Sequence, residues 1–303
     1  MEKILKFKFI FLFSFIFLFF SCASIKQREY FVPDAPVTDI ENYEKVIRIV
    51  QISDLHSNDY GENQSKLISK IKAAEPDLVF FTGDIFDFEW PVEKAVANVE
   101  KVIAAVSEIC PFYYISGNHE YYLGHDNEYE YLFSDYGGTV LQNKAVQIEI
   151  KNVNIVIAGV FDPIATIPLE ERISDGVDLE TFKINLDKTT IEAKSLNGDL
   201  TILLAHRPEF IDLYKAPGIY DLILSGHAHG GQWRFPFING LYAPGQGLFP
   251  KYAGGRYVFE SENDEPSVFI ISRGLSYQKP MFPRFGNPVE LVEILVDTEA
   301  FRK

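Results

Sequence analysis

The chain has few basic residues for its length. Its 303 residues include 28 lysines and arginines against 43 aspartates and glutamates, which gives a formal net charge of -15. A surplus of negative charge repels the phosphate backbone of nucleic acids, and the sequence contains no basic stripe to offset it. We therefore expect no nucleic-acid partner.

Cysteine is almost absent as well. The two cysteines are Cys22, at the end of an apolar N-terminal run, and Cys110, between Ile109 and Pro111. If Cys22 is modified, Cys110 remains as a single thiol and cannot form an intramolecular disulfide. We expect Cys110 to be a small, buried, apolar residue.

The N-terminus has the features of a targeting segment. Lys3, Lys6 and Lys8 precede or flank an apolar run that extends from Phe9 to Phe20 and is followed by Ser21 and Cys22. A bilayer span needs about 20 apolar residues, so this run favours a secretion signal, and an uncleaved anchor must also use the apolar residues before Phe9. A small residue followed by Cys at this place resembles the bacterial lipoprotein signal, which implies that Cys22 is acylated.

No low-complexity linker divides the rest of the chain. With 47% hydrophobic residues, the chain can bury the core of one large α/β domain. We expect residues 1–22 to be a signal or lipoprotein segment, the polar residues 23–42 to be a tether, and residues 43–303 to form the domain. This organisation predicts a protein held by its N-terminus at the extracytoplasmic face of a membrane.

Three apolar segments in the first half end in polar residues. Strands are predicted at 46–52, 78–81 and 112–116, and helices at 64–74, at 92–109 and near 128–133. The polar residues that follow the three strands are Asp54, His56, Asp84, Asn118, His119 and Glu120. Strand, helix, strand units place such endings together at the carboxyl edge of a parallel sheet, which is where chemistry is expected.

The second half repeats the pattern. Further strands are predicted at 145–150, 153–158, 200–205, 222–225, 257–259, 268–271 and 289–296. The charged segment 161–198 is predicted to be a loop with one helix around 187–196 and no catalytic residue. His206 follows one strand, and His227 and His229 follow another. Alternate residues of extended backbone point to the same side, so the last two rings can serve one metal or two neighbouring metals.

These endings form an ordered motif set that contains five of the six histidines. The set resembles the calcineurin-like metallophosphoesterase superfamily, and it consists of Asp54-x-His56, Gly83-Asp84, Gly117-Asn118-His119-Glu120, His206 and Gly226-His227-Ala228-His229. Gly-His-Ala-His-Gly-Gly-Gln and the later Leu-Tyr-Ala-Pro-Gly look like the YaeI-type membrane-associated phosphodiesterase branch. That branch is also similar to enzymes that cleave UDP-diacylglucosamine in lipid A synthesis.

The resemblance implies a fold that periodicity alone does not give. Periodicity predicts only an α/β protein with a partly parallel sheet. The family has a two-sheet β-sandwich flanked by helices, in four layers, with metals at the carboxyl ends of the strands.

The resemblance also implies two divalent metal ions, for which Mn, Fe and Zn are all suitable. The first would be held by Asp54, His56, Asp84 and His229. The second would be held by Asp84, Asn118, His206 and His227. Asp84 would therefore bridge the two ions.

The resemblance also implies roles for residues next to the ligands. His119 would lie near the leaving oxygen, as a general acid or as a donor to the phosphoryl group. Glu120 either orients His119 or is a solvated acid beside the site. Arg207 and Arg273 could steady phosphate oxygens, but a place at the surface is the commoner one for arginine and is expected for both.

The sequence thus predicts a binuclear metal-dependent phosphoester hydrolase, a phosphodiesterase or pyrophosphatase that acts on a membrane-associated or lipid-linked phosphate. One alternative is an extracytoplasmic lipoprotein that keeps the fold as a binding or scaffold module without turnover. Ligand loss would mark such a module, and no ligand of the motif set is missing. Another alternative is a secreted nucleotidase, which the acidic balance disfavours. The substrate and the oligomeric state stay open.

An aromatic stretch at 233–252 follows directly on His229. It either packs onto its own sheet, or it seats an acyl chain or meets the bilayer while the metals hold the phosphate. The residues concerned are Trp233, Phe235, Phe237, Leu241, Tyr242, Phe249 and Tyr252.

Overall fold

The structure is a computed structural model that describes residues 24–33, 45–87, 91–122, 124–174, 177–260, 266–277 and 283–301. The predicted lipidation site Cys22 and the rest of the predicted signal segment lie outside these residues. Within the described ranges, no helix is both long and apolar enough to cross a membrane.

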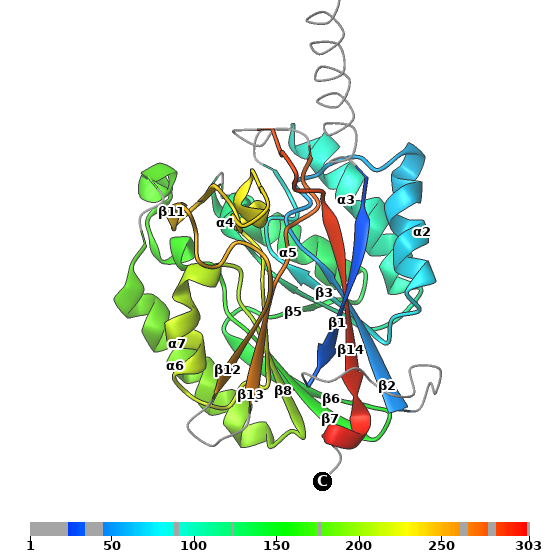
Figure 1. The fold of residues 1–303 in the computed structure, drawn as a ribbon, viewed down its shortest axis with the longest axis vertical. Coiled ribbons are helices and arrows are strands. Elements are labelled where there is room, and N and C mark those ends of the chain that lie inside the picture. The colour runs from blue at the N-terminus through cyan, green and yellow to red at the C-terminus, as the bar shows by residue number, and fades with distance from the viewer. Residues whose placement is uncertain are drawn as a thin grey trace, which may run out of the picture.

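Two six-stranded mixed sheets face each other (Figure 1). The strands of the first sheet, in spatial order, are β1 (Lys26–Val32), β14 (Glu290–Asp297), β2 (Val46–Ile52), β3 (Leu78–Thr82), β4 (Phe112–Ile115) and β5 (Thr139–Val140). Those of the second are β12 (Gly255–Glu260), β13 (Pro266–Ile271), β9 (Leu222–Ser225), β8 (Leu200–Leu204), β7 (Val153–Gly159) and β6 (Lys144–Ile150). Each sheet has a run of parallel strands, formed by β2 to β5 in one and by β7, β8, β9 and β13 in the other.

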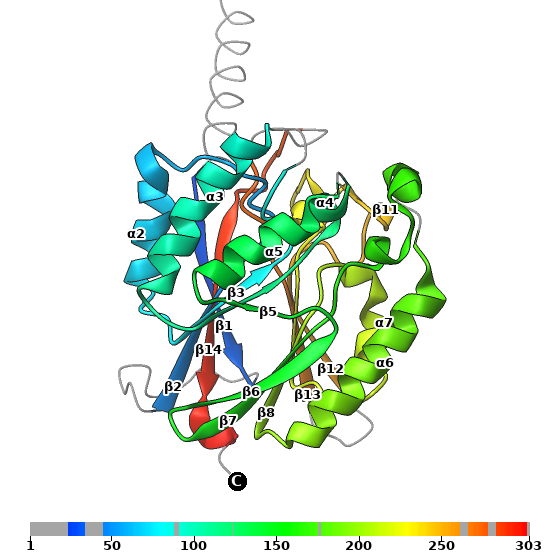
Figure 2. The same ribbon diagram turned by 180° about the vertical axis from the view of Figure 1, so that it is seen from behind.

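Helices cover the outer face of each sheet (Figure 2). Those on the first sheet are α2 (Ser65–Ala73), α3 (Val92–Ser107) and α5 (Asp126–Asp135). Those on the second are α6 (Leu179–Leu196) and α7 (Ile211–Lys215). Three buried apolar clusters separate the layers, one between the sheets and one under each set of helices. The predicted four-layer sandwich is therefore confirmed.

The sequence of β3 explains how one strand serves two of these clusters. Its residues Leu-Val-Phe-Phe-Thr are all buried, because both faces of the first sheet are covered. Successive strand residues point to opposite faces, so Phe80 packs between the sheets and Phe81 packs under the helices. A continuous apolar run is thus typical of a central strand here.

Two expectations about elements are wrong. Residues 26–32 were expected to belong to a tether, but they form β1, which pairs in parallel with β14 along the edge of the first sheet. Tyr30 and Val32 of β1 are buried in the core between the sheets, and this burial stabilises the strand. The helix expected around 187–196 begins earlier, at Leu179, where the side chain of Asp178 accepts hydrogen bonds from the N–H groups of Glu180 and Thr181.

The carboxyl ends of β2, β3, β8 and β9 meet at one edge of the sandwich. Within the first sheet, the N–H of Asp54 donates to the carbonyl of Gly83 over 3.0 Å. Within the second, the N–H of Gly226 donates to the carbonyl of His206 over 3.0 Å. The Gln51 side chain donates to the carbonyl of Ser225 over 2.9 Å and so joins the two sheets. Loops from both sheets therefore face one space.

Candidate metal centre

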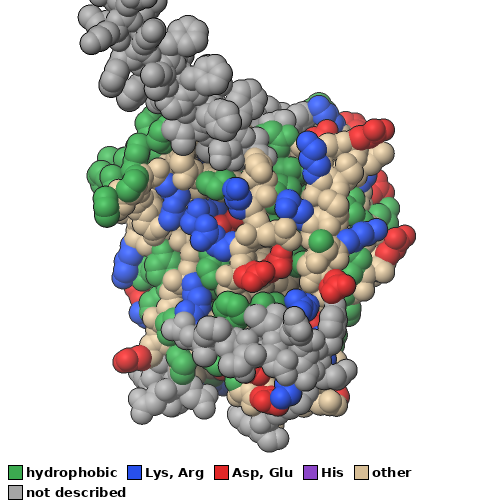
Figure 3. All heavy atoms as spheres, turned by 45° about the vertical axis from the view of Figure 1, so that its right-hand side comes forward, with side chains coloured by type: hydrophobic (Ala, Val, Ile, Leu, Met, Phe, Trp, Pro, Cys, Tyr) green, Lys and Arg blue, Asp and Glu red, His purple; other side chains and the backbone are tan. Residues whose placement is uncertain are grey.

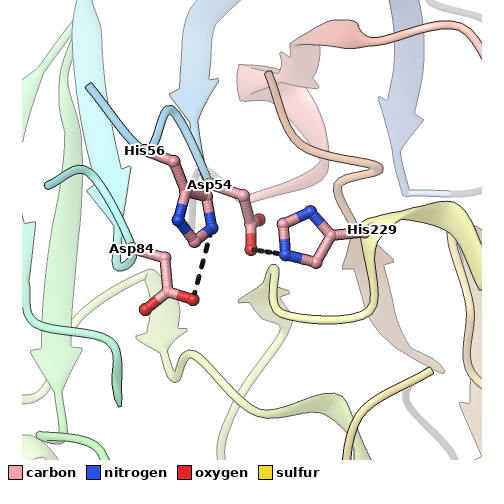
Figure 4. A group of neighbouring side chains, drawn as sticks. All are labelled: Asp54, His56, Asp84 and His229. Atoms are coloured by element: carbon pink, nitrogen blue, oxygen red, sulfur yellow. Dashed lines mark ion pairs between the residues drawn. The ribbon is translucent and has the colours of Figure 1, made fainter. Parts of the chain in front are cut away.

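The structure brings the predicted ligands together at this edge. Asp54, His56, Asp84 and His229 each offer one ligand atom, and these atoms lie within 4.8 Å of one another (Figure 4). Asp84, His206 and His227 form a second group by the same measure. Asn118 begins the short helix α4 (Asn118–Tyr121), and the N–H of its neighbour His119 donates to Asp84. The first group is the first ligand set that the resemblance implies, and the second group contains three of the four members of the second set.

Asp84 lies between the two groups. Its Oδ2 is 3.1 Å from His206 Nε2 and 3.6 Å from His56 Nε2. Its Oδ1 accepts the N–H of His119 over 2.9 Å. A single carboxylate therefore faces ligands of both groups.

Several buried polar atoms at the site lack a hydrogen-bond partner within the described part of the chain. They include Oδ1 of Asn118 and Nε2 of His56 and His227. A buried polar atom left unpaired costs about 1–3 kcal/mol, so such a gathering is unfavourable without a bound partner. Carboxylate, amide and imidazole together suit divalent Mn, Fe or Zn, and the residues present fit such an ion.

Hydrogen bonds from neighbouring residues fix two of the candidate ligands. Nδ1 of His206 lies 2.7 Å from the carbonyl of Thr82, which accepts its proton and directs Nε2 toward Asp84. Oδ1 of Asp54 accepts the N–H of His227 over 2.8 Å, and Oδ2 accepts the hydroxyl of Ser53 over 2.6 Å. Because these contacts cross between strand ends, the ligands are oriented before any metal binds.

Backbone strain marks the same residues. Left-handed φ values occur at Asp54 (49°), His56 (47°), Asp84 (51°), His227 (65°) and His229 (47°). A non-glycine residue in this region costs about 1–3 kcal/mol and persists only where its surroundings hold it, which is typical of functional sites. Glycine relieves the crowding nearby, because a Cβ at Gly226 would overlap the side chains of Ser53 and Asp54.

Burial and charge set the protonation of the ligands. Burial lowers the pKa of His227 and His229 well below the usual range, so both rings are neutral and able to bind a metal. Burial alone would raise the pKa of Asp84, but the nearby rings of His206 and His119 hold it well below its usual value. Burial opposes protonation of His206, yet the charge of Asp84 raises its pKa to about 10. A metal bound at that ring would displace the proton.

His119 is accessible to a substrate. Its side chain is 23% exposed, whereas that of His56 beside it is 5% exposed. The two rings contact edge to face with centroids 4.2 Å apart. Burial lowers the pKa of His119, but the charges of Asp84 and Asp87 outweigh this effect and raise it.

Asp87 is a site residue that the sequence interpretation missed. Its Oδ1 lies 3.7 Å from Nδ1 of His119, and its Oδ2 lies 3.9 Å from Nδ1 of His56. These three residues form a third group of close ligand atoms. The signal was the spacing Gly83-Asp84-x-x-Asp87, which keeps both carboxylates in the loop that follows β3.

Glu120 differs from one of its two predicted roles. It is fully buried, so the prediction of a solvated acid is wrong. Its carboxylate accepts the N–H groups of Gly117, Asp84, Ile85 and Phe86 at 2.8, 3.0, 2.7 and 3.0 Å. The side chain therefore ties the loop after β3 to the loop after β4.

The expectation that Arg207 and Arg273 lie at the surface is also wrong. Arg207 is buried, and its Nε donates to Oδ2 of Asp162 over 2.7 Å. Arg273 is 12% exposed and lies 3.5 Å from Glu290. Buried carboxylates offset the desolvation of both guanidinium groups, and neither partner is near in sequence.

Glu209 is a second residue that the sequence interpretation missed. Its Oε1 lies 3.9 Å from Nε2 of His227 and 3.8 Å from Nη1 of Arg207. Burial raises the pKa of this carboxyl to about 7. Its position three residues after His206 was the available signal.

Comparison with known proteins agrees with this geometry. Residues 47–231 match the family profile described as calcineurin-like phosphoesterase. An uncharacterized metallophosphoesterase of Campylobacter jejuni is 30% identical over 71% of this chain and 55% of its own length. A bovine transmembrane protein with metallophosphoesterase domain is 29% identical over 87% of this chain and 56% of its own length. This chain therefore spans about half the length of these curated relatives.

A solved structure shares the fold. The 5'-nucleotidase precursor from Thermus thermophilus superposes with a TM-score of 0.51 at 13% identity, over 85% of this chain and 56% of that chain. This likeness shows the fold alone. The family profile covers more than half of the chain and spans every candidate ligand from Asp54 to His229. The chain therefore belongs to the calcineurin-like phosphoesterase family.

Proposed function

We propose that this chain is a binuclear metal-dependent hydrolase that cleaves a phosphodiester or diphosphate bond in a membrane-associated or lipid-linked substrate. Family membership and the ligand cluster support a metal-dependent phosphoesterase. The observation that carries the binuclear proposal is Asp84, which belongs to both groups of ligand atoms. A bridging carboxylate allows two dications to sit close together.

The charges of the ligand set favour an anionic substrate. Two dications would bring four positive charges, whereas Asp54 and Asp84 bring two negative ones and the other ligands are neutral. The loaded site would be electropositive within a chain of net charge -15. A phosphate would be drawn to this edge of the sandwich in preference to the rest of the surface.

Residues of this chain have separate tasks in hydrolysis. Bound divalent metals would polarise the phosphate oxygens and supply a nucleophile from water at neutral pH. The partly exposed ring of His119 can reach the substrate, and Asp87 at 3.7 Å favours its protonated form. A protonated imidazole at this position suits donation of a proton to the leaving oxygen. Glu120 keeps His119 and Asp84 in register by binding the backbone of both loops.

The aromatic stretch supports a membrane-associated substrate. Phe237 is fully exposed and Phe249 is 65% exposed. Tyr252 is buried in the apolar cluster under α6 and α7, so it is not one of the residues that could contact a substrate. Exposed aromatic side chains beside a catalytic edge are suited to contact lipid. The bovine relative is named a transmembrane protein. We also propose that the chain belongs to the YaeI-type branch. We further propose that Cys22 is acylated and that the domain lies on the extracytoplasmic side of the membrane.

Metal content tests the binuclear proposal. Elemental analysis of the metal-loaded chain is expected to give two ions, and Asp84→Asn is expected to lose part of this content. Hydrolysis of bis-p-nitrophenyl phosphate by the variant should fall by at least about a hundredfold. Asp135→Asn, an exposed acid at the end of α5, is the matched control. One tightly held ion in the unaltered chain, or full activity in Asp84→Asn, contradicts the proposal.

A substrate panel tests the bond that is cleaved. Soluble phosphodiester, phosphomonoester and lipid-linked diphosphate substrates should be compared on one metal-loaded sample. Turnover of the diester or diphosphate well above the monoester is expected. A clear preference for the monoester contradicts the proposed substrate class.

A further inference from the structure

Two arginines contact one buried carboxylate near the edge of the first sheet. Glu290, at the start of β14, is 1% exposed. Its Oε2 lies 3.1 Å from Nε of Arg28 and 3.5 Å from Nε of Arg273, and its Oε1 accepts the N–H of Arg273 over 3.0 Å. Arg28 belongs to β1, and its side chain is 41% exposed. Solvent therefore reaches the cluster from the β1 side.

Arg234 completes this group, which we call the arginine cluster (Arg28, Arg234 and Arg273). A Cβ at Gly254 would lie 2.8 Å from Cγ of Arg273 and 3.6 Å from Nη1 of Arg234, so the two side chains flank the same glycine. Burial and the charge of Arg273 lower the pKa of Arg234 to about 10, while Glu290 acts in the opposite direction. Arg28 and Arg273 thus contact the carboxylate of Glu290, and Arg234 adds a third positive charge beside Arg273, so the three guanidinium groups outnumber this carboxylate.

Exposed rings adjoin the cluster and form what we call the aromatic edge (Trp233, Phe235 and Phe237). The first two flank Arg234 in sequence, and all three are exposed. Nε1 of Trp233 donates to the carbonyl of Pro283 over 2.8 Å, and the ring of Phe235 lies 5.3 Å from that of Phe285. Figure 3 shows one face of the molecule, on which lysine and arginine side chains lie among hydrophobic ones, several of them on its upper half. The rings are therefore held in place and exposed in the described part of the chain.

The arginine cluster is connected to the metal centre by short contacts. Nη1 of Arg234 donates to the carbonyl of Gly230, the residue after His229, over 3.1 Å. Gly274 follows Arg273, and a Cβ there would lie 2.6 Å from Cβ of Asp54. The segments that carry Arg234 and Arg273 therefore adjoin the residues that carry two of the candidate metal ligands, His229 and Asp54.

We propose that the arginine cluster binds the phosphate of anionic lipid headgroups while the aromatic edge enters the bilayer interface. The inference rests on the proposed function, because it names the surface that would present a membrane-associated substrate to the metals. Arginine pairs with phosphate through parallel N–H donors, and aromatic rings favour the interfacial zone of a bilayer. An excess of positive charge in a chain of net charge -15 selects an anionic membrane over a neutral one.

Fluorescence of Trp233 tests this docking in the full-length chain. The sequence has two tryptophans, so Trp90→Phe leaves Trp233 as the only emitter. The chain is reconstituted in phosphatidylcholine vesicles, with or without phosphatidylglycerol, that carry brominated acyl chains as quenchers. Quenching is expected with the anionic lipid and should weaken as salt is raised. Equal quenching in neutral vesicles, or none in either, overturns the proposal.

Two variants separate the arginines from the rest of the surface. Arg28→Gln and Arg234→Gln are each expected to shift the docked-to-undocked ratio about fivefold toward undocked. Lys188→Gln, an exposed lysine on α6, is the matched control and should have no effect. Arg273 is left intact because Glu290 would lose its most buried partner. Unchanged quenching in both arginine variants, with the fold verified by thermal melting, overturns the proposal.

Two further measurements separate the remaining explanations. Inorganic phosphate is titrated in the absence of vesicles, and a saturable change in Trp233 emission would assign a free-phosphate site and overturn the lipid proposal. Hydrolysis of bis-p-nitrophenyl phosphate by the unaltered chain is measured separately. Quenching without turnover supports docking and contradicts the proposed hydrolase, whereas turnover without quenching does the reverse.

Discussion

The metal centre and the arginine cluster are carried by adjoining segments but are built differently. The candidate ligands are buried, stand at the ends of neighbouring strands, and are fixed by backbone contacts such as that of His227 with Asp54. The arginine cluster joins Arg28, Arg234 and Arg273 from three distant segments, and its most peripheral member is 41% exposed. A site at strand ends is thus encoded in short local motifs, whereas a surface assembled from remote segments has no local pattern.

The largest effect is expected on stability, at the metal centre, when Glu120 is removed. Glu120→Ala leaves four buried N–H groups without their acceptor, at about 1–3 kcal/mol each, so the free energy of unfolding should fall by about 4 kcal/mol or more. Urea denaturation measures this loss. Glu128→Ala removes an exposed acid from α5 and should change the stability by less than about 0.5 kcal/mol. Equal stability of the two variants would show that the loops do not depend on Glu120.

A smaller effect, confined to chemistry, is expected from His119→Ala. Loss of a proton donor should lower kcat by about 10²–10⁴ for substrates with poor leaving groups, and by less for a nitrophenolate. Metal content should stay nearly intact, because His119 is not among the proposed ligands. His125→Ala, which alters a partly exposed ring outside the groups of ligand atoms, is the control. A uniform loss across leaving groups, or loss of metal, argues against the assigned role.

The smallest effect is expected at the exposed aromatic residues, and it concerns the apparent KM. Phe237→Ala combined with Phe249→Ala should raise the apparent KM for a lipid-linked substrate by about five- to tenfold and leave a soluble phosphodiester almost unchanged. Tyr131→Ala, at an exposed ring on α5, provides the control. If both substrates are affected alike, the loop is structural. If neither changes, these aromatics do not face the substrate.

Much of the fold could be predicted because central strands are apolar and end abruptly. The strand Val46–Ile52 was predicted with its observed bounds, since every residue but Arg48 is buried and polar Ser53 follows. The edge strand β1 was missed because its sequence Lys-Gln-Arg-Glu-Tyr-Phe-Val is mostly polar on its exposed side. Its partner β14 lies at the other end of the chain, so no local sequence pattern predicts that the two strands pair.

The candidate ligands could be predicted because their side-chain types and spacing limit the chemistry available to them. Glu120 and Arg207 were harder, because a charged side chain reveals its burial only through its partners. Those partners are the backbone N–H groups of the β3 loop for Glu120 and Asp162 for Arg207. Neither partner is recognisable until the fold has brought it near.

The hydrogen bonds that cross from one sheet to the other at the metal edge have a consequence for motion. His206 in the second sheet is bonded to Thr82 in the first, and Asp54 in the first is bonded to His227 in the second. If one sheet slid over the other, these distances and the ligand positions would change together. The two sheets should therefore move least relative to each other at the metal edge and most at the opposite edge of the sandwich. Backbone amides at that opposite edge should exchange fastest with solvent.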